Sequence, residues 1–160
     1  MAEILDSGKR REFDTGAVRD IAEGKGRCDL LPLDVIGTLM NDIILVSIEA
    51  FRQTGQIHCL HDVLRNFNGF SDIRTQILEL SVHFEDGAKK YGEHNWQKGI
   101  PLHCYMDSAI RHYLKFRRGD DDERHDRAFV WNIVCGIWTK MHLPEMDDFT
   151  EKNNTVCSQT

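Results

Sequence analysis

Many of the side chains able to bind a metal ion or a phosphate group fall within one stretch, residues 83–118. We expect this stretch to span the end of one helix, a polar turn and a second helix. A simple connection would not need amide, aromatic and basic residues together. The stretch contains Glu85, Asp86, Lys89, Lys90, Asn95, Trp96, Asp107, Arg111 and His112. We therefore interpret it as the functional centre.

Carboxylates in this stretch and just before it could hold a divalent cation. Glu79, Glu85 and Asp86 lie on the first expected helix and Asp107 on the second. Mg²⁺ needs several oxygen ligands on rigid elements, and two antiparallel helices could bring such carboxylates together. Glu85 follows Phe84 at the edge of an apolar stripe, where an unpaired carboxylate is costly. The alternative interpretation is that all four are solvated surface charges.

The basic and aromatic residues nearby suit a nucleotide. Lys90 and Arg111 could bind phosphate oxygens, unless they form ordinary surface ion pairs. Asn95 and Trp96, next to Tyr91, could contact a nucleobase by hydrogen bonding and stacking. Trp96 could equally close the end of a helical bundle.

A further polar group comprises His112, His125 and Asn132. The spacing of His125 and Asn132 places both on one helix face, two turns apart. With His112 they could complete a polar pocket or orient a water molecule, or they could be polar residues between packed helices. The chain has no P-loop, GxSxG or HExxH motif, so phosphate chemistry would depend on a carboxylate-bound metal.

The elements expected to position these residues are helical. Apolar residues recur at helical spacing, with capping and stop residues at the ends, and no strand-like alternation is present. We expect main helices over residues 31–55, 71–91, 101–119 and 123–141, with a short one over 59–67. The predicted fold is all-α and four-helix-bundle-like, with an N-terminal arm (1–29), a helical nucleotide-binding domain (30–142) and a flexible tail (143–160).

The arm is rich in glycine and in charges of both signs. It has too few apolar residues for a core of its own, so it could be a solvated segment. The alternative is that it folds over a site and contributes Lys25, Arg27 and Asp29.

Composition limits the function classes. The 160 residues carry a net charge of −6, which argues against a nucleic-acid partner. The five cysteines are dispersed, which favours reduced thiols. No signal peptide or membrane-spanning run is visible, so a cytoplasmic location without a membrane partner is expected. The very apolar first helix predicts a homo-oligomer.

Several motifs together resemble a known family. They are SGKRREF, GAVRDIAEGKGRCDLLP, FEDGAKKYGEHNWQKGIPL, DSAIRHYLKFRRG and HDRAFVWN, between residues 7 and about 140. In this order they are similar to the phage and prophage family of dATP/dGTP diphosphohydrolase N-terminal domains. That family is grouped with MazG-like all-α nucleotide pyrophosphohydrolases. A phage-encoded member would act in the host cytoplasm.

The resemblance implies Mg²⁺-dependent hydrolysis of purine deoxynucleoside triphosphates to monophosphate and pyrophosphate. It implies catalytic roles for Glu85, His112 and His125, and metal binding by Glu85 and Asp107. Glu79 is not one of the family-like positions, and its place on the first expected helix adds it as a third metal ligand. The implied substrate-binding residues are Arg27, Lys90, Tyr91, Asn95, Trp96, Arg111 and Asn132.

The sequence also departs from the family pattern. Similar sequences often carry a second histidine three residues after the position of His125, where this chain has Ala128. The acidic spacing of MazG-like helices is not clearly present either. These departures favour an alternative, a nucleotide-binding protein that sequesters its ligand without catalysis. A helical protein-interaction module is the third hypothesis.

Overall fold

A computed structural model describes residues 4–149, and it confirms the all-α class. Its described part contains six α-helices, two short strands and three single-turn 3₁₀ helices. The helices are α1 (Leu33–Met40), α2 (Ile43–Thr54), α3 (Ile57–Asn66), α4 (Ile73–Tyr91), α5 (Leu102–Arg118) and α6 (His125–His142).

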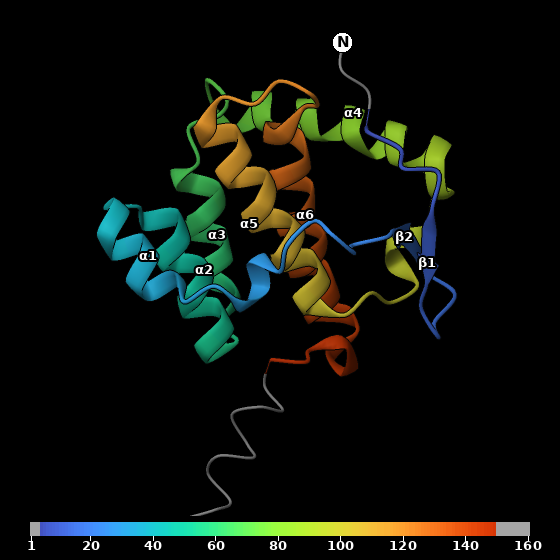
Figure 1. The fold of residues 1–160 in the computed structure, drawn as a ribbon, viewed down its shortest axis with the longest axis horizontal. Coiled ribbons are helices and arrows are strands. Elements are labelled where there is room, and N and C mark those ends of the chain that lie inside the picture. The colour runs from blue at the N-terminus through green and yellow to red at the C-terminus, as the bar shows by residue number, and fades with distance from the viewer. Residues whose placement is uncertain (1–3, 150–160) are drawn as a thin grey trace, which may run out of the picture.

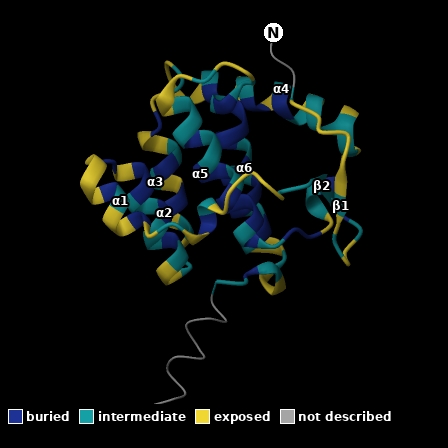
Figure 2. Cartoon of the chain, in the orientation of Figure 1, coloured by how far each residue is buried: buried dark blue, intermediate teal, exposed yellow. Residues whose placement is uncertain are grey.

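Helices α5 and α6 form the centre of the fold. They lie side by side, with α1–α3 on one side and α4 across one end (Figure 1). Tyr105 and Tyr113 of α5 and Phe129 of α6 are almost completely buried, and Figure 2 shows many buried positions along these two helices. At the α5–α6 contact, a Cβ on Gly136 would lie 2.9 Å from the Met106 side chain. A larger residue there would therefore require the end of the Met106 side chain to move.

The prediction of one continuous helix over residues 31–55 is wrong. Asn41 adopts a left-handed conformation with φ 51°, which ends α1. Asp42 then caps α2 by accepting hydrogen bonds from the backbone N–H groups of Ile44 and Leu45. Asn and Asp are residues that tolerate these two conformations. The apolar pattern continues across the break because both short helices pack on the same core.

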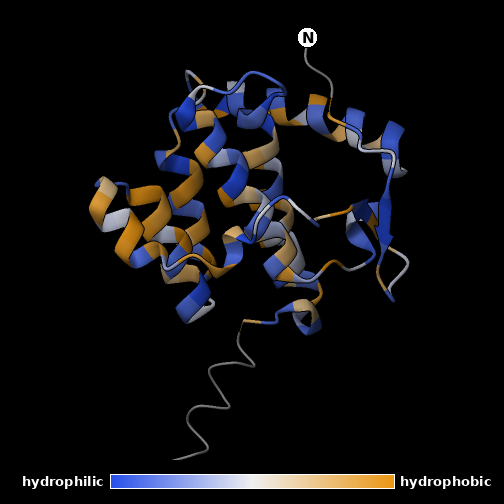
Figure 3. Cartoon of the chain, in the orientation of Figure 1, coloured by the Kyte–Doolittle hydropathy of each residue, from blue (hydrophilic) through white to orange (hydrophobic). Residues whose placement is uncertain are grey.

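Part of the apolar surface of α1 remains uncovered. Val35 is 63% and Leu39 84% exposed, and Met40 and Ile43 are also open to solvent. Figure 3 shows that hydrophobic positions are frequent in this α1–α2 part of the fold. This surface is compatible with the predicted homo-oligomer, which stays a prediction.

The N-terminal arm contains the two strands, which the sequence did not predict. β1 (Arg10–Glu12) and β2 (Val18–Asp20) pair antiparallel, with Arg10 opposite Asp20. Their charged residues pair locally, since the Arg10 guanidinium contacts Asp6 at 2.7 Å and Asp20 at 2.8 Å. From this hairpin the chain returns across α5 to α1 (Figure 1).

The start of the predicted tail is packed against the helices. Asp148 accepts hydrogen bonds from the backbone and ring of His103, and Lys140 pairs with Asp147. The ring of Phe149 meets Phe51 edge-on, with centroids 6.5 Å apart. Residues 150–160, the rest of the tail predicted to be flexible, lie outside the described residues.

Two expectations from composition can be compared with the described residues. Cys28, Cys59, Cys104 and Cys135 are free thiols, as their dispersed positions suggested. Within residues 4–149, no helix is long and apolar enough to cross a bilayer.

Candidate functional site

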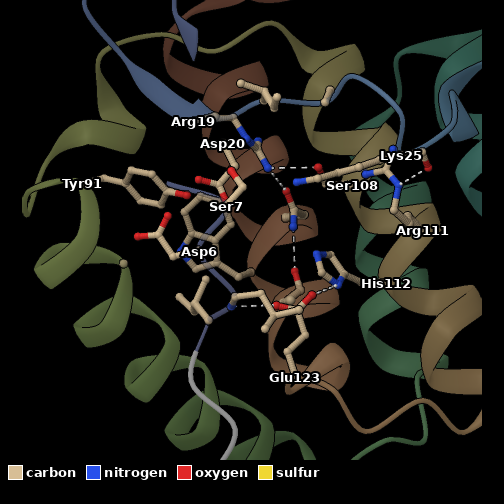
Figure 4. Close-up of a pocket in the computed structure, with 18 of the residues that line it drawn as sticks. Asp6, Ser7, Arg19, Asp20, Lys25, Tyr91, Ser108, Arg111, His112 and Glu123 are labelled. Carbon is tan, nitrogen blue, oxygen red and sulfur yellow. Dashed lines mark hydrogen bonds and ion pairs between the residues drawn. The ribbon is translucent and has the colours of Figure 1, made fainter. Parts of the chain in front are cut away.

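A pocket of about 530 Å³ lies between the arm, α4, α5 and α6 (Figure 4). Its volume falls in the usual range of small-molecule sites. The arm forms one wall, and the helices form the others. The polar and aromatic residues that line it include Ser7, Arg11, Arg19, Lys25, His83, Tyr91, Asn95, Ser108, Arg111, His112, Glu123, Trp131 and Asn132.

Two side chains that do not belong to the arm, Asn95 and Lys90, hold the arm over the pocket. The buried Asn95 amide accepts from the backbone N–H of Val18 at 2.7 Å and donates to its carbonyl at 2.8 Å. Lys90 binds Asp20 at 3.0 Å and the carbonyl of Leu5 at 2.6 Å. The arm is therefore packed against the helices over this pocket, and of the three residues that it was expected to contribute to a site, only Lys25 lines the pocket.

Arg19, on β2, projects from the arm into the pocket (Figure 4). One terminal nitrogen, Nη2, donates to Ser108 Oγ at 3.1 Å and to Asn132 Oδ1 at 2.9 Å. The other, Nη1, is buried and has no hydrogen-bond partner. Among the described residues no carboxylate lies within 4 Å of this guanidinium. A buried positive charge without a counter-ion is unfavourable, so the site is suited to an anion.

Two further donors at the pocket are also unsatisfied. They are Arg11 Nε and Trp131 Nε1. Together with Arg19 Nη1 they make up three of the five buried, unpaired polar side-chain atoms of the described chain. Buried polar groups are nearly always hydrogen-bonded in native proteins. Three orphan donors at one pocket indicate a ligand rich in acceptor oxygens or nitrogens.

Lys25 is a third positively charged side chain of the arm at this pocket, besides Arg19 and Arg11. Its pKa is lowered by burial, and it has no carboxylate within 4 Å in the described structure. Arg111 positions the Lys25 loop by donating to the carbonyls of Lys25 and Gly26 at 3.2 and 2.9 Å. Arg111 is in turn bound to Asp107 at 2.5 Å. Arg111 lines the pocket, but these contacts already engage its guanidinium, and its role in phosphate binding stays a prediction.

A histidine–carboxylate cluster lies at another wall of the pocket. His112 Nδ1 is 3.0 Å from His125 Nδ1 and 3.4 Å from Glu123 Oε1. The other ring nitrogen of His125, Nε2, is 2.7 Å from Asp122 Oδ1. Burial lowers the pKa of His112 well below its usual value, so its ring is neutral at pH 7. His112 and Glu123 line the pocket, while His125 lies behind them.

The three carboxylates predicted to bind Mg²⁺ are not brought together. Glu79 pairs with Arg124 and Arg127, and Asp107 pairs with Arg111. The Glu85 side chain is 64% exposed and pairs with Lys89 at 2.7 Å. The two groups of potential metal ligands found in residues 4–149 contain none of the three. The arrangement therefore does not fit a shared Mg²⁺ ion.

The predicted base-binding residues have other partners. The Trp96 ring packs against Phe84 and Trp138, with centroids 5.4 and 4.9 Å away, and it does not line the pocket. This matches the alternative in which Trp96 closes the end of the bundle. Tyr91 does line the pocket, and the Arg10 guanidinium lies 5.2 Å from its ring centre.

Two other predicted substrate contacts also have assigned partners. Arg27 pairs with Asp29 at 2.6 Å and lines a separate hollow beside Cys104 and His103. Asn132 lines the pocket and orients Arg19. Asn132 is therefore the predicted substrate residue whose placement agrees best with a role at the site.

Sequence reasoning missed Arg19, Arg11, Trp131 and Glu123. Arg19 and Arg11 belong to an arm of mixed charge, in which no spacing rule separates a ligand-binding arginine from a solvated one. Trp131 falls within an apolar helix and Glu123 within an acidic run. The possibility of an arm folded over a site was the one available signal for the arginines.

Comparison with known protein families gives a partial match. Residues 73–149, just under half of the chain, match the model for dATP/dGTP diphosphohydrolase, N-terminal. The match covers α4, α5 and α6 and does not include the arm. No curated protein and no solved structure matches the chain at a significant level.

Proposed function

Because residues 73–149 match the model for dATP/dGTP diphosphohydrolase, N-terminal, we propose that the pocket binds a purine deoxynucleoside triphosphate. The proposed reaction is hydrolysis between the α- and β-phosphates, which yields the monophosphate and pyrophosphate. The arm lies outside the family match and would then complete the site by supplying positively charged side chains.

The observation that carries this proposal is the set of unpaired donors in the pocket. Arg19 Nη1, Arg11 Nε and Trp131 Nε1 all lack an acceptor, and Lys25 lacks a carboxylate partner within 4 Å in the described residues. A triphosphate offers many acceptor oxygens and the negative charge that the Arg and Lys side chains require. A neutral ligand would leave the Arg19 charge uncompensated.

The pocket also suggests how the ligand lies. We place the phosphates against Arg19, Arg11 and Lys25, where the arm faces α5 and α6. The base would lie toward Tyr91 and Trp131, which supply aromatic surface and one free donor. Base contact by Asn95 would compete with its two hydrogen bonds to Val18.

In the hydrolysis step, the oxygen of a water molecule would bond to the α-phosphorus. The bond from that phosphorus to the bridging oxygen breaks, pyrophosphate leaves, and the water releases a proton. The arginine and lysine side chains would stabilise the charge that develops on the phosphate oxygens. The cluster of His112, Glu123 and His125 at the pocket wall is suited to orient the water.

Product analysis tests the proposal. Purified protein would be incubated with a panel of purine and pyrimidine nucleoside triphosphates, with divalent cations or with EDTA, and the products separated by ion-exchange chromatography. We expect cation-dependent formation of a purine monophosphate and pyrophosphate in equal amounts. Formation of a diphosphate and inorganic phosphate instead would contradict the proposed bond cleavage.

Binding without turnover is the second candidate, and one observation favours it. Glu79, Glu85 and Asp107 are all engaged in ion pairs, at separate places on the structure. The carboxylates expected to organise a catalytic Mg²⁺ are therefore occupied. Recovery of intact nucleotide from the product assay, with a raised melting temperature in its presence, would select this candidate.

A further inference from the structure

We propose that His112, Glu123 and His125 form a binding site for one divalent transition-metal ion at the wall of the pocket. The ligand atoms would be the Nδ1 atoms of the two histidines and Oε1 of Glu123. The proposal goes beyond the proposed function, because it depends on the geometry of this cluster and not on the identity of the nucleotide.

The spacing of the three atoms carries the proposal. His112 Nδ1 and His125 Nδ1 are 3.0 Å apart, and Glu123 Oε1 is 3.4 and 3.5 Å from them. Ligand atoms placed about 2.1 Å from one zinc ion at tetrahedral angles are about 3.4 Å apart. The three atoms therefore already lie near the corners of one face of a metal coordination shell.

The partner of the second His125 nitrogen supports the same conclusion. Asp122 Oδ1 is 2.7 Å from His125 Nε2. An ionised carboxylate only accepts hydrogen bonds, so the ring proton lies on Nε2 and Nδ1 presents a lone pair to the cluster. Carboxylates commonly hold metal-binding histidines in this way.

Glu123 has no strong cationic partner. In the described structure its ion-pair partners are His112 and His125, and its other carboxylate oxygen accepts only a 3.4 Å hydrogen bond from the Leu5 backbone. Its side chain is only 12% exposed. A metal ion bound between Glu123 and the two imidazoles would give this partly buried carboxylate a cationic partner.

The backbone holds the three ligands firmly. His112 lies within α5, and His125 is the first residue of α6. The Glu123 carbonyl accepts a 2.9 Å hydrogen bond from the His125 backbone N–H, which fixes the loop before α6. Because His112 and Glu123 line the pocket, a bound ion would have its remaining coordination positions on the side of the ligand.

The ligand types select the class of metal. Two imidazoles and one carboxylate suit zinc, cobalt, iron or manganese, whereas magnesium prefers oxygen ligands alone. We therefore expect Zn²⁺ and Co²⁺ to bind at one ion per chain. A large excess of Mg²⁺ should not displace them.

The competing explanation is a metal-free hydrogen bond from His112 Nδ1–H to His125 Nδ1. Co²⁺ titration of EDTA-treated protein distinguishes the two, since bound Co²⁺ gives visible absorption bands that depend on its ligands. Isothermal titration calorimetry with Zn²⁺ would give the stoichiometry. Glu123→Gln is the main test variant because it keeps the size of the side chain, and His125→Asn is the second.

Two further variants complete the design. Asp122→Asn leaves the three ligands in place but removes the carboxylate that holds His125, and we expect it to weaken Zn²⁺ binding by roughly 10- to 100-fold. His94→Gln is the control: it removes an exposed histidine outside the pocket and should leave the stoichiometry and affinity of Zn²⁺ binding unchanged. Circular dichroism would confirm that each variant is folded.

The expected result is one tight ion per wild-type chain and loss of tight binding in folded Glu123→Gln. The absence of Zn²⁺ and Co²⁺ binding by the wild type would overturn the proposal. Unchanged stoichiometry and affinity in Glu123→Gln would overturn it as well. Both readouts are independent of turnover, so failure of this site and failure of the proposed hydrolysis can be told apart.

Discussion

Arg19 of the N-terminal arm donates a 2.9 Å hydrogen bond to Asn132 of α6, across 113 residues of sequence. The bond fixes Nη2 and leaves Nη1 buried, unpaired and at the pocket. Asn132 therefore positions Arg19 at the pocket, and direct contact of Asn132 with a substrate stays a prediction. The guanidinium is held in one orientation before any ligand arrives, which lowers the entropy cost of binding.

Replacing Arg19 tests whether this orientation serves the nucleotide. Charge-assisted hydrogen bonds contribute about 1.5–3 kcal/mol, so Arg19→Gln should raise the Kd of a purine deoxynucleoside triphosphate by roughly 10- to 150-fold. Isothermal titration calorimetry in EDTA measures the Kd without turnover. Arg74→Gln, an exposed arginine at the start of α4, is the matched control. Equal affinity of the two variants would contradict a role for Arg19.

Asn95 provides a test of how the arm is held. Asn95→Ala removes both hydrogen bonds to Val18, and at about 1 kcal/mol each the loss should be roughly 2 kcal/mol of arm attachment. We expect faster amide hydrogen exchange in residues 8–27 and weaker nucleotide binding in the same variant. If Asn95 instead contacts the base, binding should weaken while exchange in the arm stays as in the wild type.

A Glu85 variant tests whether this residue binds a metal, as expected from the sequence, or only forms a surface ion pair, as seen in the structure. The sequence places it at a metal, whereas the structure shows a 64% exposed side chain paired with Lys89. Exposed pairs of this kind contribute about 0.5 kcal/mol or less, so Glu85→Gln should leave stability and turnover nearly unchanged. Urea unfolding would measure the stability of the variant, and the product assay would measure its turnover. Loss of turnover without loss of stability would restore the metal-binding role.

The helices were predictable because their signals are local. The apolar stripes and end residues of α4, α5 and α6 place their bounds within about two residues of those observed, as is usual for strongly periodic segments. The break at Asn41 and Asp42 was missed because the apolar pattern runs through it. There the capping chemistry of two polar residues outweighs the periodicity.

The site was predictable only in part because the arm closes it. Tyr91, Arg111, His112 and Asn132 all line the pocket, and helical spacing alone grouped them. Arg19 reaches the same place through the pairing of Val18 with Asn95, a contact between residues 77 positions apart. No local pattern encodes that contact. Glu123 was hidden for a similar reason, since a run of acidic residues at a helix start already has an electrostatic explanation.

The pair of His103 and Asp148 predicts a pH dependence of stability. The pKa of His103 is raised from 6.5 to about 10 in the folded protein, mainly by the hydrogen bond between His103 and Asp148 and secondly by the one between His103 and Cys104. The pair should therefore stabilise the fold fully below about pH 6.5, where His103 is charged in both states. This contribution falls as the pH rises and is lost above the folded-state pKa of about 10.

Unfolding in urea at several pH values measures the effect. Both side chains of the pair are about a third exposed, so solvent screening should limit the contribution to about 1 kcal/mol or less. The difference in unfolding free energy between wild type and His103→Gln should be largest at pH 6 and near zero above pH 10. Because Asp148 anchors residues 143–149, proteolysis near Phe149 should follow the same trend. A difference that grows with pH would show that the charged pair does not hold this segment.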